Sequence, residues 1–294
     1  MDQGVIALGI GGFYYVRDDS GTEYVLRARK KFRHEHITPL VGDRVLFSRE
    51  ESKDSQGWID EILPRTNVCF RPPVANIGVM CIVIAPKPEP DWALVDKLLI
   101  YAFKHGICAC IVVNKCDIEK DCFLTAKSDY RDTDVGIVQV SAQNKEGLDE
   151  LRRELNGRVA CFTGQSGVGK STLLNALFGL EQETGAISRK TERGKNTTRK
   201  SELFCMDGLS VIDTPGFSLF EEIEKPEDPA LLCGLYPEFE KYAGECRFQP
   251  CFHDTEPGCA VSNAAETGQI SMNRLQRYRE LYRISKERWK NRYD

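Results

Sequence analysis

One eight-residue segment in the second half of the chain has the composition of a phosphate-binding loop. Gly164–Ser171 reads Gly-Gln-Ser-Gly-Val-Gly-Lys-Ser, with an apolar strand pattern at 159–162 before it and a helical pattern at 171–178 after it. Glycines let backbone N–H groups converge on phosphate oxygens without interference from a Cβ atom. The positive end of the following helix then faces the anion. These flanking elements favour a nucleotide site over a plain strand-to-helix turn.

The residues of this loop have separate expected roles. Lys170 should reach the β- and γ-phosphates, and the Ser171 hydroxyl should ligate Mg²⁺. The residues expected to contact the nucleotide from this segment are Gly164, Gln165, Ser166, Gly167, Val168, Gly169, Lys170, Ser171 and Thr172.

A second segment has the pattern of a γ-phosphate sensor. Asp213-Thr214-Pro215-Gly216 follows an apolar strand, so Asp213 is placed to hold Mg²⁺ through water and the Gly216 N–H can contact the γ-phosphate. The polar segment 191–200 contains Thr197 and Thr198, and a threonine hydroxyl there, for which we favour Thr198, could complete the Mg²⁺ shell. An ordinary turn at the first segment and a solvated loop at the second remain alternatives.

Two strand ends upstream carry the residues that would read a guanine base. Asn114-Lys115-Cys116-Asp117 follows the strand pattern 109–113, and the Asp117 carboxylate can accept both N1–H and N2–H₂ of guanine, a donor pair that adenine lacks. Lys115 can lay its stem over the base, and Asn114 can brace the loop. Ser141-Ala142-Gln143 is the expected companion loop, with Ser141 and Ala142 at the nucleotide. An ATPase or kinase with a coincidental match is the alternative.

The order of these loops is itself informative. The base-reading loops at 114–117 and 141–143 precede the phosphate loop at 164–171, whereas most GTPases have the reverse order. A circular permutation explains this order, since the termini of a compact domain lie at its surface. The segment after Gly216 would then lead directly into a C-terminal module.

A cysteine and histidine cluster near the C-terminus has the spacing of a metal site. Cys246-x₄-Cys251-x-His253-x₅-Cys259 offers three thiolates and one imidazole, which suits a closed tetrahedral structural Zn²⁺. Disulfides or unrelated free thiols are the alternatives, and Cys233 does not fit the spacing. The other cysteines in apolar surroundings are expected in the core: Cys69, Cys81, Cys108, Cys110, Cys161 and Cys205.

Three regions are needed to position these residues. Short strand patterns separated by turn residues predict an OB-type β-barrel over 1–65, an RNA-binding domain. Alternating strands and helices predict an α/β, circularly permuted P-loop GTPase domain over 66–224. Residues 225–294 lack strand patterns and are expected to form a helical zinc-binding domain.

Composition narrows the class of protein. Of the 294 residues, 29% are charged and 41% are hydrophobic, as in soluble globular proteins, and neither a membrane span nor a signal peptide is apparent, so a cytoplasmic protein is expected. The net charge of −4 argues weakly against general polyanion binding. Local basic series at 27–33 and 274–292 are either solvated surface or RNA contacts, and the first lies on the predicted barrel.

With these motifs assembled, the chain resembles the circularly permuted ribosome small-subunit-dependent GTPase A family. Besides the motif order and the zinc spacing, the resemblance includes the segments Gly12–Val16 and Pro39–Val45, and it covers essentially the whole chain. It implies a GTP hydrolase that uses Mg²⁺, carries one structural Zn²⁺, and binds the small ribosomal subunit and its rRNA. Late maturation of that subunit, hydrolysis of GTP to GDP stimulated by it, and a monomeric state are expected.

Two positions bear on hydrolysis. Phe217 stands where many GTPases place a water-orienting glutamine, and Asn196 stands where members of the family typically carry a histidine. An amide can orient water but cannot accept its proton, so we hypothesise slow hydrolysis by the free protein. The candidate catalytic residues are Lys170, Asn196, Thr198, Asp213 and Gly216. A non-enzymatic RNA-binding module is the remaining alternative.

Overall fold

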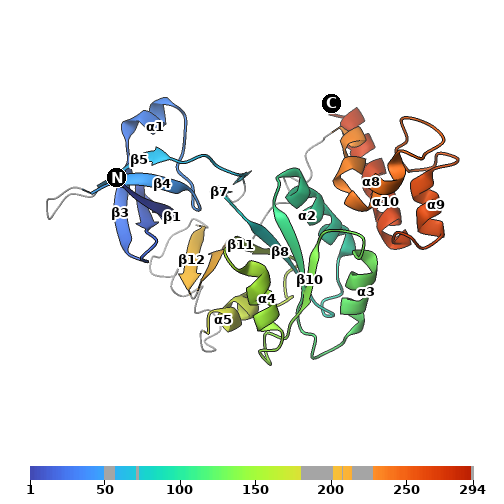
Figure 1. Ribbon diagram of the computed structural model, residues 1–294, viewed down its shortest axis with the longest axis horizontal. Helices are drawn as coiled ribbons and strands as arrows, with labels where there is room; N and C mark the ends of the chain where they lie inside the picture. The colour runs from blue at the N-terminus through green and yellow to red at the C-terminus, as the bar shows by residue number, and fades with distance from the viewer. Residues whose placement is uncertain (50–56, 71–72, 180–200, 207, 214–227, 293–294) are drawn as a thin grey trace.

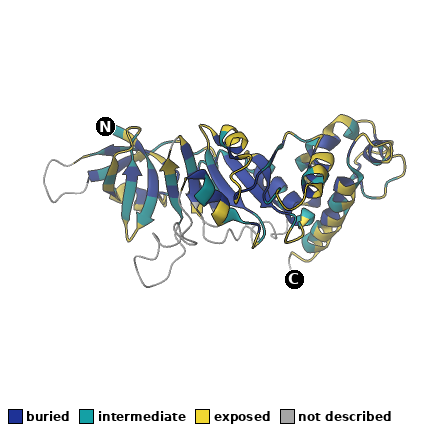
Figure 2. Ribbon diagram, turned by 90° about the horizontal axis from the view of Figure 1, so that it is seen from below, coloured by how far each residue is buried: buried dark blue, intermediate teal, exposed yellow. Residues whose placement is uncertain are grey.

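The computed structural model describes residues 1–49, 57–70, 73–179, 201–206, 208–213 and 228–292, with the backbone alone for Phe70 and Asp213. Three parts follow one another in a row, from a barrel at the N-terminal end through a central sheet to a helical module at the C-terminal end (Figure 1). Buried residues concentrate along the strands and the inner sides of the helices (Figure 2). Among the described helices, none is both long and apolar enough to cross a membrane.

The N-terminal part is a five-stranded barrel, as predicted. Its elements are β1 (Asp2–Ile10), β2 (Phe13–Arg17), β3 (Glu23–Ala28), α1 (Lys30–His34), β4 (Arg44–Ser48) and β5 (Gly57–Ile62). β1 pairs antiparallel with both β2 and β4, and β3 lies parallel to β5, which closes the barrel. Alternate strand residues fill the interior: Ile6, Val16, Leu26, Val45, Phe47 and Ile59.

The central sheet has the strand order β10-β9-β8-β11-β13-β12. Its strands are β8 (Val79–Ile84), β9 (Cys108–Val113), β10 (Gly136–Gln139), β11 (Val159–Thr163), β12 (Glu202–Met206) and β13 (Leu209–Asp213). All are parallel except β12, which pairs antiparallel with β13. Every residue of β8 is buried, as expected for a parallel strand that is covered on both faces.

Helices cover both faces of this sheet. α2 (Trp92–Lys104) and α3 (Asp121–Asp129) pack in one core cluster, while α4 (Leu148–Leu155) and α5 (Lys170–Leu177) pack in the other. A hairpin of β6 (Val68–Phe70) and β7 (Pro73–Ala75) connects barrel and sheet. β12 also pairs with β1, so the strands of the two parts form one continuous sheet.

In the described residues of the C-terminal module, 228–292, the regular elements are all helical, and a loop at 244–259 joins two of the helices. It contains the 3₁₀ turns η1 (Pro229–Leu231) and η2 (Cys233–Leu235) and the helices α8 (Pro237–Ala243), α9 (Ala260–Glu266) and α10 (Met272–Lys290). Tyr236, Phe239 and Tyr278 form its aromatic centre, with ring centroids 4.9 to 5.0 Å apart. Together with the barrel and the central sheet, this helical module confirms the predicted fold class.

The prediction of six core cysteines is right for four. Cys69, Cys81, Cys110 and Cys161 are buried, whereas Cys108 and Cys205 are exposed. Cys108 is the first residue of β9, before the covering helices begin to shield it, and Cys205 belongs to the exposed end of β12. The burial of these cysteines therefore depends more on their position within a strand than on apolar neighbours in the sequence.

Candidate functional site

The predicted phosphate loop joins β11 to α5 at the carboxyl edge of the sheet, and two of its glycines are required sterically. Gly164 has φ +134, and a Cβ atom there would lie 2.1 Å from the Val83 carbonyl oxygen. Gly169 has φ +92, and its Cβ would lie 2.5 Å from Nδ2 of Asn114. The loop therefore packs so closely on the neighbouring strand ends that side chains at these positions would displace it.

The cationic side chain of the loop folds over its own backbone. Lys170 Nζ donates to the carbonyl oxygens of Gly164 (2.8 Å) and Gln165 (2.6 Å). Burial lowers the pKa of this lysine. Val168 is fully buried and anchors the loop, while Ser171 and Thr172 are exposed on the first turn of α5. The arrangement presents a lysine, two hydroxyls and a helix N-terminus together, the groups that bind phosphate and Mg²⁺ in P-loop proteins.

A single buried amide binds three of the predicted segments together. Asn114 is 2% exposed, and its Nδ2 donates to the Val168 carbonyl oxygen at 2.9 Å. Its Oδ1 accepts from the backbone N–H of Ala142 at 3.1 Å. The loops at 114–117, 141–143 and 164–171, distant in sequence, therefore meet at one side chain.

The neighbouring residues complete this junction. Lys115, with φ +61, donates from Nζ to the carbonyl oxygens of Gly167 (2.8 Å) and Lys87 (2.7 Å). Ser141 is fully buried, and its Oγ accepts from the backbone N–H of Asn144 at 3.1 Å. Asp117 is exposed at the same sheet edge. The exposed Asp117 side chain is therefore accessible to a ligand, two residues beyond Lys115, which contacts the phosphate loop.

One contact of the phosphate loop has no signal in the sequence. Gln165 Oε1 accepts from the backbone N–H of Asp91 at 3.0 Å, and its Nε2 donates to the Glu89 carbonyl oxygen at 3.2 Å. Asp91 also caps α2 by accepting from the Leu94 N–H at 2.9 Å. The loop is thus attached to the N-terminus of α2.

Several predicted residues lie outside the described part of the chain. These are Asn196, Thr197, Thr198, Gly216 and Phe217. The backbone of Asp213 ends β13, which lies directly beside β11, the strand that leads into the phosphate loop.

The predicted metal ligands come together in the C-terminal module. The ligand atoms of Cys246, Cys251, His253 and Cys259 all lie within 4.8 Å of one another, and all four residues are buried. His253 Nδ1 is 3.3 Å from Cys259 Sγ and 3.7 Å from Cys246 Sγ. Four such atoms at one point can hold a metal ion.

The surroundings of the cluster suit a cation. Burial raises the pKa of the Cys251 thiol to about 12, so a thiolate there requires a compensating positive charge. Burial lowers the pKa of His253, which favours the neutral imidazole that ligates metals. Backbone N–H groups of Ala260 and Ser262 donate to the sulfurs of Cys246 and Cys259, each at 3.4 Å.

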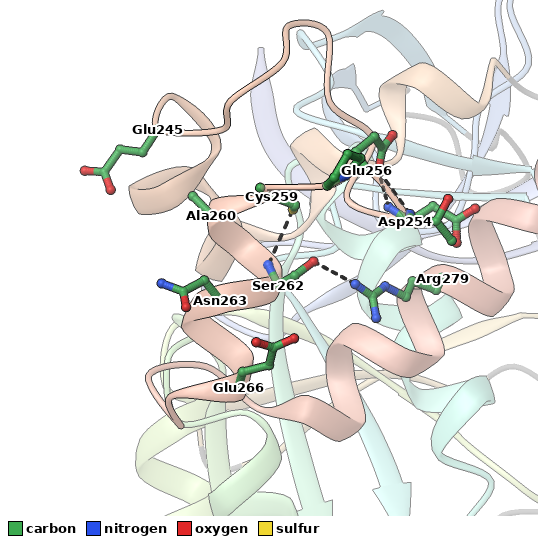
Figure 3. Close-up of a pocket in the computed structure, with 12 residues that line it drawn as sticks. Glu245, Asp254, Glu256, Cys259, Ala260, Ser262, Asn263, Glu266 and Arg279 are labelled. Carbon is green, nitrogen blue, oxygen red and sulfur yellow. Dashed lines mark hydrogen bonds between the residues drawn. The ribbon is translucent and has the colours of Figure 1, made fainter.

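A hollow of about 750 Å³ lies beside the cluster, and four of the five charged residues that line it are acidic. Figure 3 shows Arg279 turned toward Ser262, to whose Oγ it donates at 2.7 Å. The carboxylates along the hollow belong to Glu245, Asp254, Glu256 and Glu266. This lining repels a phosphate backbone, so the hollow is unsuited to RNA.

Arg274 is buried and Arg277 is mostly buried, contrary to both alternatives considered for the C-terminal basic series. Arg274 is 1% exposed and donates to Glu238 Oε1 (2.7 Å) and Asp96 Oδ1 (2.6 Å). Arg277 donates to Asp96 Oδ2 (2.6 Å) and Asp129 Oδ2 (3.0 Å). At these positions the charges neither contact RNA nor face solvent, because carboxylates of α2, α3 and α8 neutralise them.

Gly169→Ala tests the phosphate-loop geometry. The new Cβ would displace the Asn114 amide, and the combined backbone strain and lost buried hydrogen bond predict about 100-fold weaker nucleotide binding. Titration of a fluorescent GDP analogue measures this loss. Gly179→Ala is the matched control, since Gly179 has φ +63 but no atom within 4 Å of the added Cβ. Equal affinities for the two variants would contradict the geometry.

Comparison with known proteins gives consistent matches over nearly the whole chain. The model of the RsgA GTPase family matches residues 62–222, and that of the RsgA N-terminal domain matches residues 3–59. A protein named small ribosomal subunit biogenesis GTPase RsgA, from Ruminiclostridium cellulolyticum, is 44% identical over 98% of this chain and 95% of its own length. The protein of the same name from Geobacillus thermodenitrificans is 42% identical over 98% of this chain and 99% of its own length.

Solved structures show the same arrangement. The crystal structure of YjeQ from Thermotoga maritima has a TM-score of 0.81 and 31% identity, and covers 96% of this chain and 97% of that protein. The crystal structure of YloQ, described as a circularly permuted GTPase, has a TM-score of 0.81 and 32% identity. The match covers 98% of this chain and 96% of that protein.

Proposed function

The chain belongs to the RsgA GTPase family, and from this premise we propose that it hydrolyses GTP to GDP and phosphate while assisting the late maturation of the small ribosomal subunit. The observation that carries the proposal is the Asn114 amide, which joins the base-reading and phosphate-binding loops in one site. The permuted order of these loops agrees with the similarity to YloQ, which is described as a circularly permuted GTPase.

We assign the nucleotide contacts as follows. Asp117 reads the guanine edge, Lys115 lies over the base, and Lys170 binds the β- and γ-phosphates. Mg²⁺ is held by Ser171, Thr198 and Asp213, and Gly216 contacts the γ-phosphate. Asn196 is the candidate for orienting water. These assignments follow the roles that P-loop chemistry gives to such residues, and the described loops bring Lys115 and Lys170 to the same edge of the sheet.

The metal of the C-terminal cluster is proposed to be one structural Zn²⁺. Three sulfurs and one imidazole nitrogen form a soft, tetrahedral donor set that favours zinc over Mg²⁺ or Ca²⁺. All four residues are buried, so no position is left for a substrate. The ion would hold together a loop, 246–259, whose own apolar contacts are few.

The barrel is the proposed contact with rRNA. Phe13 of β2, Arg27 of β3 and Trp58 of β5 occupy paired positions on adjacent strands. The Arg27 guanidinium lies 4.6 Å from the Phe13 ring centroid, and that of Arg29 lies 5.6 Å from the Trp58 ring centroid. Rings stacked with cationic groups suit unpaired bases and a phosphate backbone. This face, unlike the acidic hollow, attracts a polyanion.

Arg27→Gln tests the barrel contact. Loss of one cationic stacking group predicts about tenfold weaker binding to small ribosomal subunits. The slope of log affinity against log salt concentration should also become smaller by about one. Cosedimentation with the subunits over a series of salt concentrations measures both. Arg17→Gln serves as control, because Arg17 lies on the same hairpin but is paired with Glu23 at 3.4 Å. Unchanged binding and salt slope in Arg27→Gln would contradict an RNA contact on this face.

The proposal also includes the cellular location, the oligomeric state and the domain limits of the protein. A ribosomal partner places the protein in the cytoplasm, and we propose that it acts there as a monomer. The proposed domain limits are 1–65, 66–224 and 225–294, and the matched family models end near the first two of these.

Two rival functions are separable by nucleotide experiments. Equal potency of ATP and GTP in displacing a fluorescent guanine nucleotide would favour an ATPase or kinase. Absence of phosphate release in single-turnover reactions, with and without ribosomal subunits, would favour an RNA-binding module without catalysis. The proposed function predicts strong GTP preference and release of phosphate.

A further inference from the structure

The N-terminal end of α2 is attached to the phosphate loop. The Gln165 side chain holds the backbone of Glu89 and Asp91, at the start of α2. The carbonyl oxygen of the same residue accepts from Lys170 Nζ at 2.6 Å. Gln165 therefore contacts both the proposed phosphate-binding lysine and the first turn of α2.

The same helix carries a fully buried carboxylate that belongs to a different network. Asp96 is 0% exposed and accepts from Arg274 (2.6 Å), Arg277 (2.6 Å) and the hydroxyl of Tyr130 (2.6 Å). Asp96 follows Asp91 by little more than one helical turn, about 7.5 Å along the axis. A short, rigid stretch of helix therefore separates the phosphate loop from this carboxylate.

The arginines that bind Asp96 belong to the metal-binding module. Both lie on α10, and the guanidinium of Arg274 lies 4.9 Å from the Tyr130 ring centroid and 4.5 Å from that of Tyr236. Ile100 of α2 packs against the core of the module. Asp129 of α3 accepts from Ser271, Asn273 and Arg277 at 2.9 to 3.0 Å. The module is thus docked on α2 and α3 through charges removed from water.

We propose that Gln165 and Asp96 are positioning residues that link the docking of the metal-binding module to the geometry of the phosphate loop through α2. The inference rests on the proposed nucleotide site and adds a regulatory role for the C-terminal module. Because each contact is a specific hydrogen bond or ion pair, a change in the docked position of α10 shifts α2, and with it Gln165, whose carbonyl oxygen accepts from Lys170. By thermodynamic linkage, bound nucleotide then stabilises the docked module.

A double-mutant cycle on nucleotide affinity tests this link. Gln165→Met removes both side-chain hydrogen bonds to the start of α2 at similar volume, and Arg277→Gln removes the ion pairs of Arg277, whose side chain is 15% exposed. We expect Arg277→Gln, remote from the nucleotide, to weaken binding of a fluorescent non-hydrolysable GTP analogue about fivefold. In the double variant, Arg277→Gln should add no further loss, since the link is already broken.

Controls separate positioning from general destabilisation. Arg283→Gln lies on the same helix but breaks only the pair with Asp254 inside the module, at 2.6 Å, and should leave affinity within about twofold. Arg277→Lys keeps the charge and should restore most of the loss. Zinc content, and hydrogen exchange of α9, should match the wild type in Arg277→Gln. In the wild type, nucleotide should slow exchange in α10, and in Gln165→Met it should not.

Two results would overturn the inference: an affinity of Arg277→Gln within twofold of the wild type, or losses that multiply in the double variant. A wild type that binds ATP as well as GTP would count against the proposed function instead. In that case the double-mutant cycle would still be measured with whichever nucleotide binds, so failure of the inference can be distinguished from failure of the proposed function.

Discussion

Replacing Asp117 with asparagine is expected to weaken GTP binding by about 1,000-fold or more. The carboxylate is the only group assigned to accept both N1–H and N2–H₂ of guanine, and an amide accepts one hydrogen bond while its NH₂ group opposes the other donor. Sites built on such hydrogen bonds reject mismatched ligands by factors of 10⁴ or more. Xanthosine triphosphate carries a carbonyl at C2 that can accept from the asparagine, so its affinity should rise. Competition titrations with GTP, ATP and XTP measure these changes.

Asp121→Asn is the matched control for this experiment. Asp121 begins α3, a few residues beyond Asp117, and is likewise exposed, but it lies outside the base-reading segment. Its substitution should leave the nucleotide preference unchanged. If Asp117→Asn kept its preference for GTP over XTP, Asp117 would not be the guanine-reading residue.

The second large effect is expected from loss of the metal. In Cys251→Ser, or after chelation of the wild-type protein, the C-terminal module should unfold, because apparent binding energies of structural zinc reach about 10 kcal/mol or more. The residual core of the module is small, and its buried His253 would lose its ligand role. Hydrogen exchange should become fast in α8, α9 and the C-terminal half of α10, while the central sheet stays protected. Metal analysis should give one zinc per chain in the wild type.

Cys233→Ser controls for the loss of a thiol in the same module. Cys233 Sγ is 3.5 Å from the Ala230 carbonyl oxygen and lies outside the cluster. This variant should keep its zinc and its slow exchange. A Cys251→Ser protein with full zinc content and unchanged exchange would contradict the assigned ligand set.

Local patterns explain which parts of the fold could be predicted from the sequence. The phosphate loop depends on residues within one short window, and the strand and helix that flank it lie at nearly the predicted bounds. The meeting of the base and phosphate loops could be predicted as well, because parallel strands place their carboxyl ends at one edge. The metal cluster could be predicted from the spacing of its cysteine and histidine residues alone.

The parts that could not be predicted depend on partners far away in the sequence. Arg274 looks like one more residue of a basic helix, and only the carboxylates of Asp96 and Glu238 make it a buried residue. The contact of Gln165 with the start of α2 depends on tertiary structure in the same way. β12 is short and partly exposed, and its pairing with β1 and β13 determines its conformation. Tertiary contacts, in each case, override weak local signals.

The hydrolysis rate of GTP with small ribosomal subunits, with large subunits and with neither tests the proposed function most directly. Neither Phe217 nor Asn196, the residues at the two positions expected to orient water, has a side chain that can take a proton from it. We therefore predict slow hydrolysis alone, a rate at least about tenfold higher with small subunits, and no increase with large subunits. Fast hydrolysis by the free protein that neither subunit changes would contradict a function coupled to the small subunit.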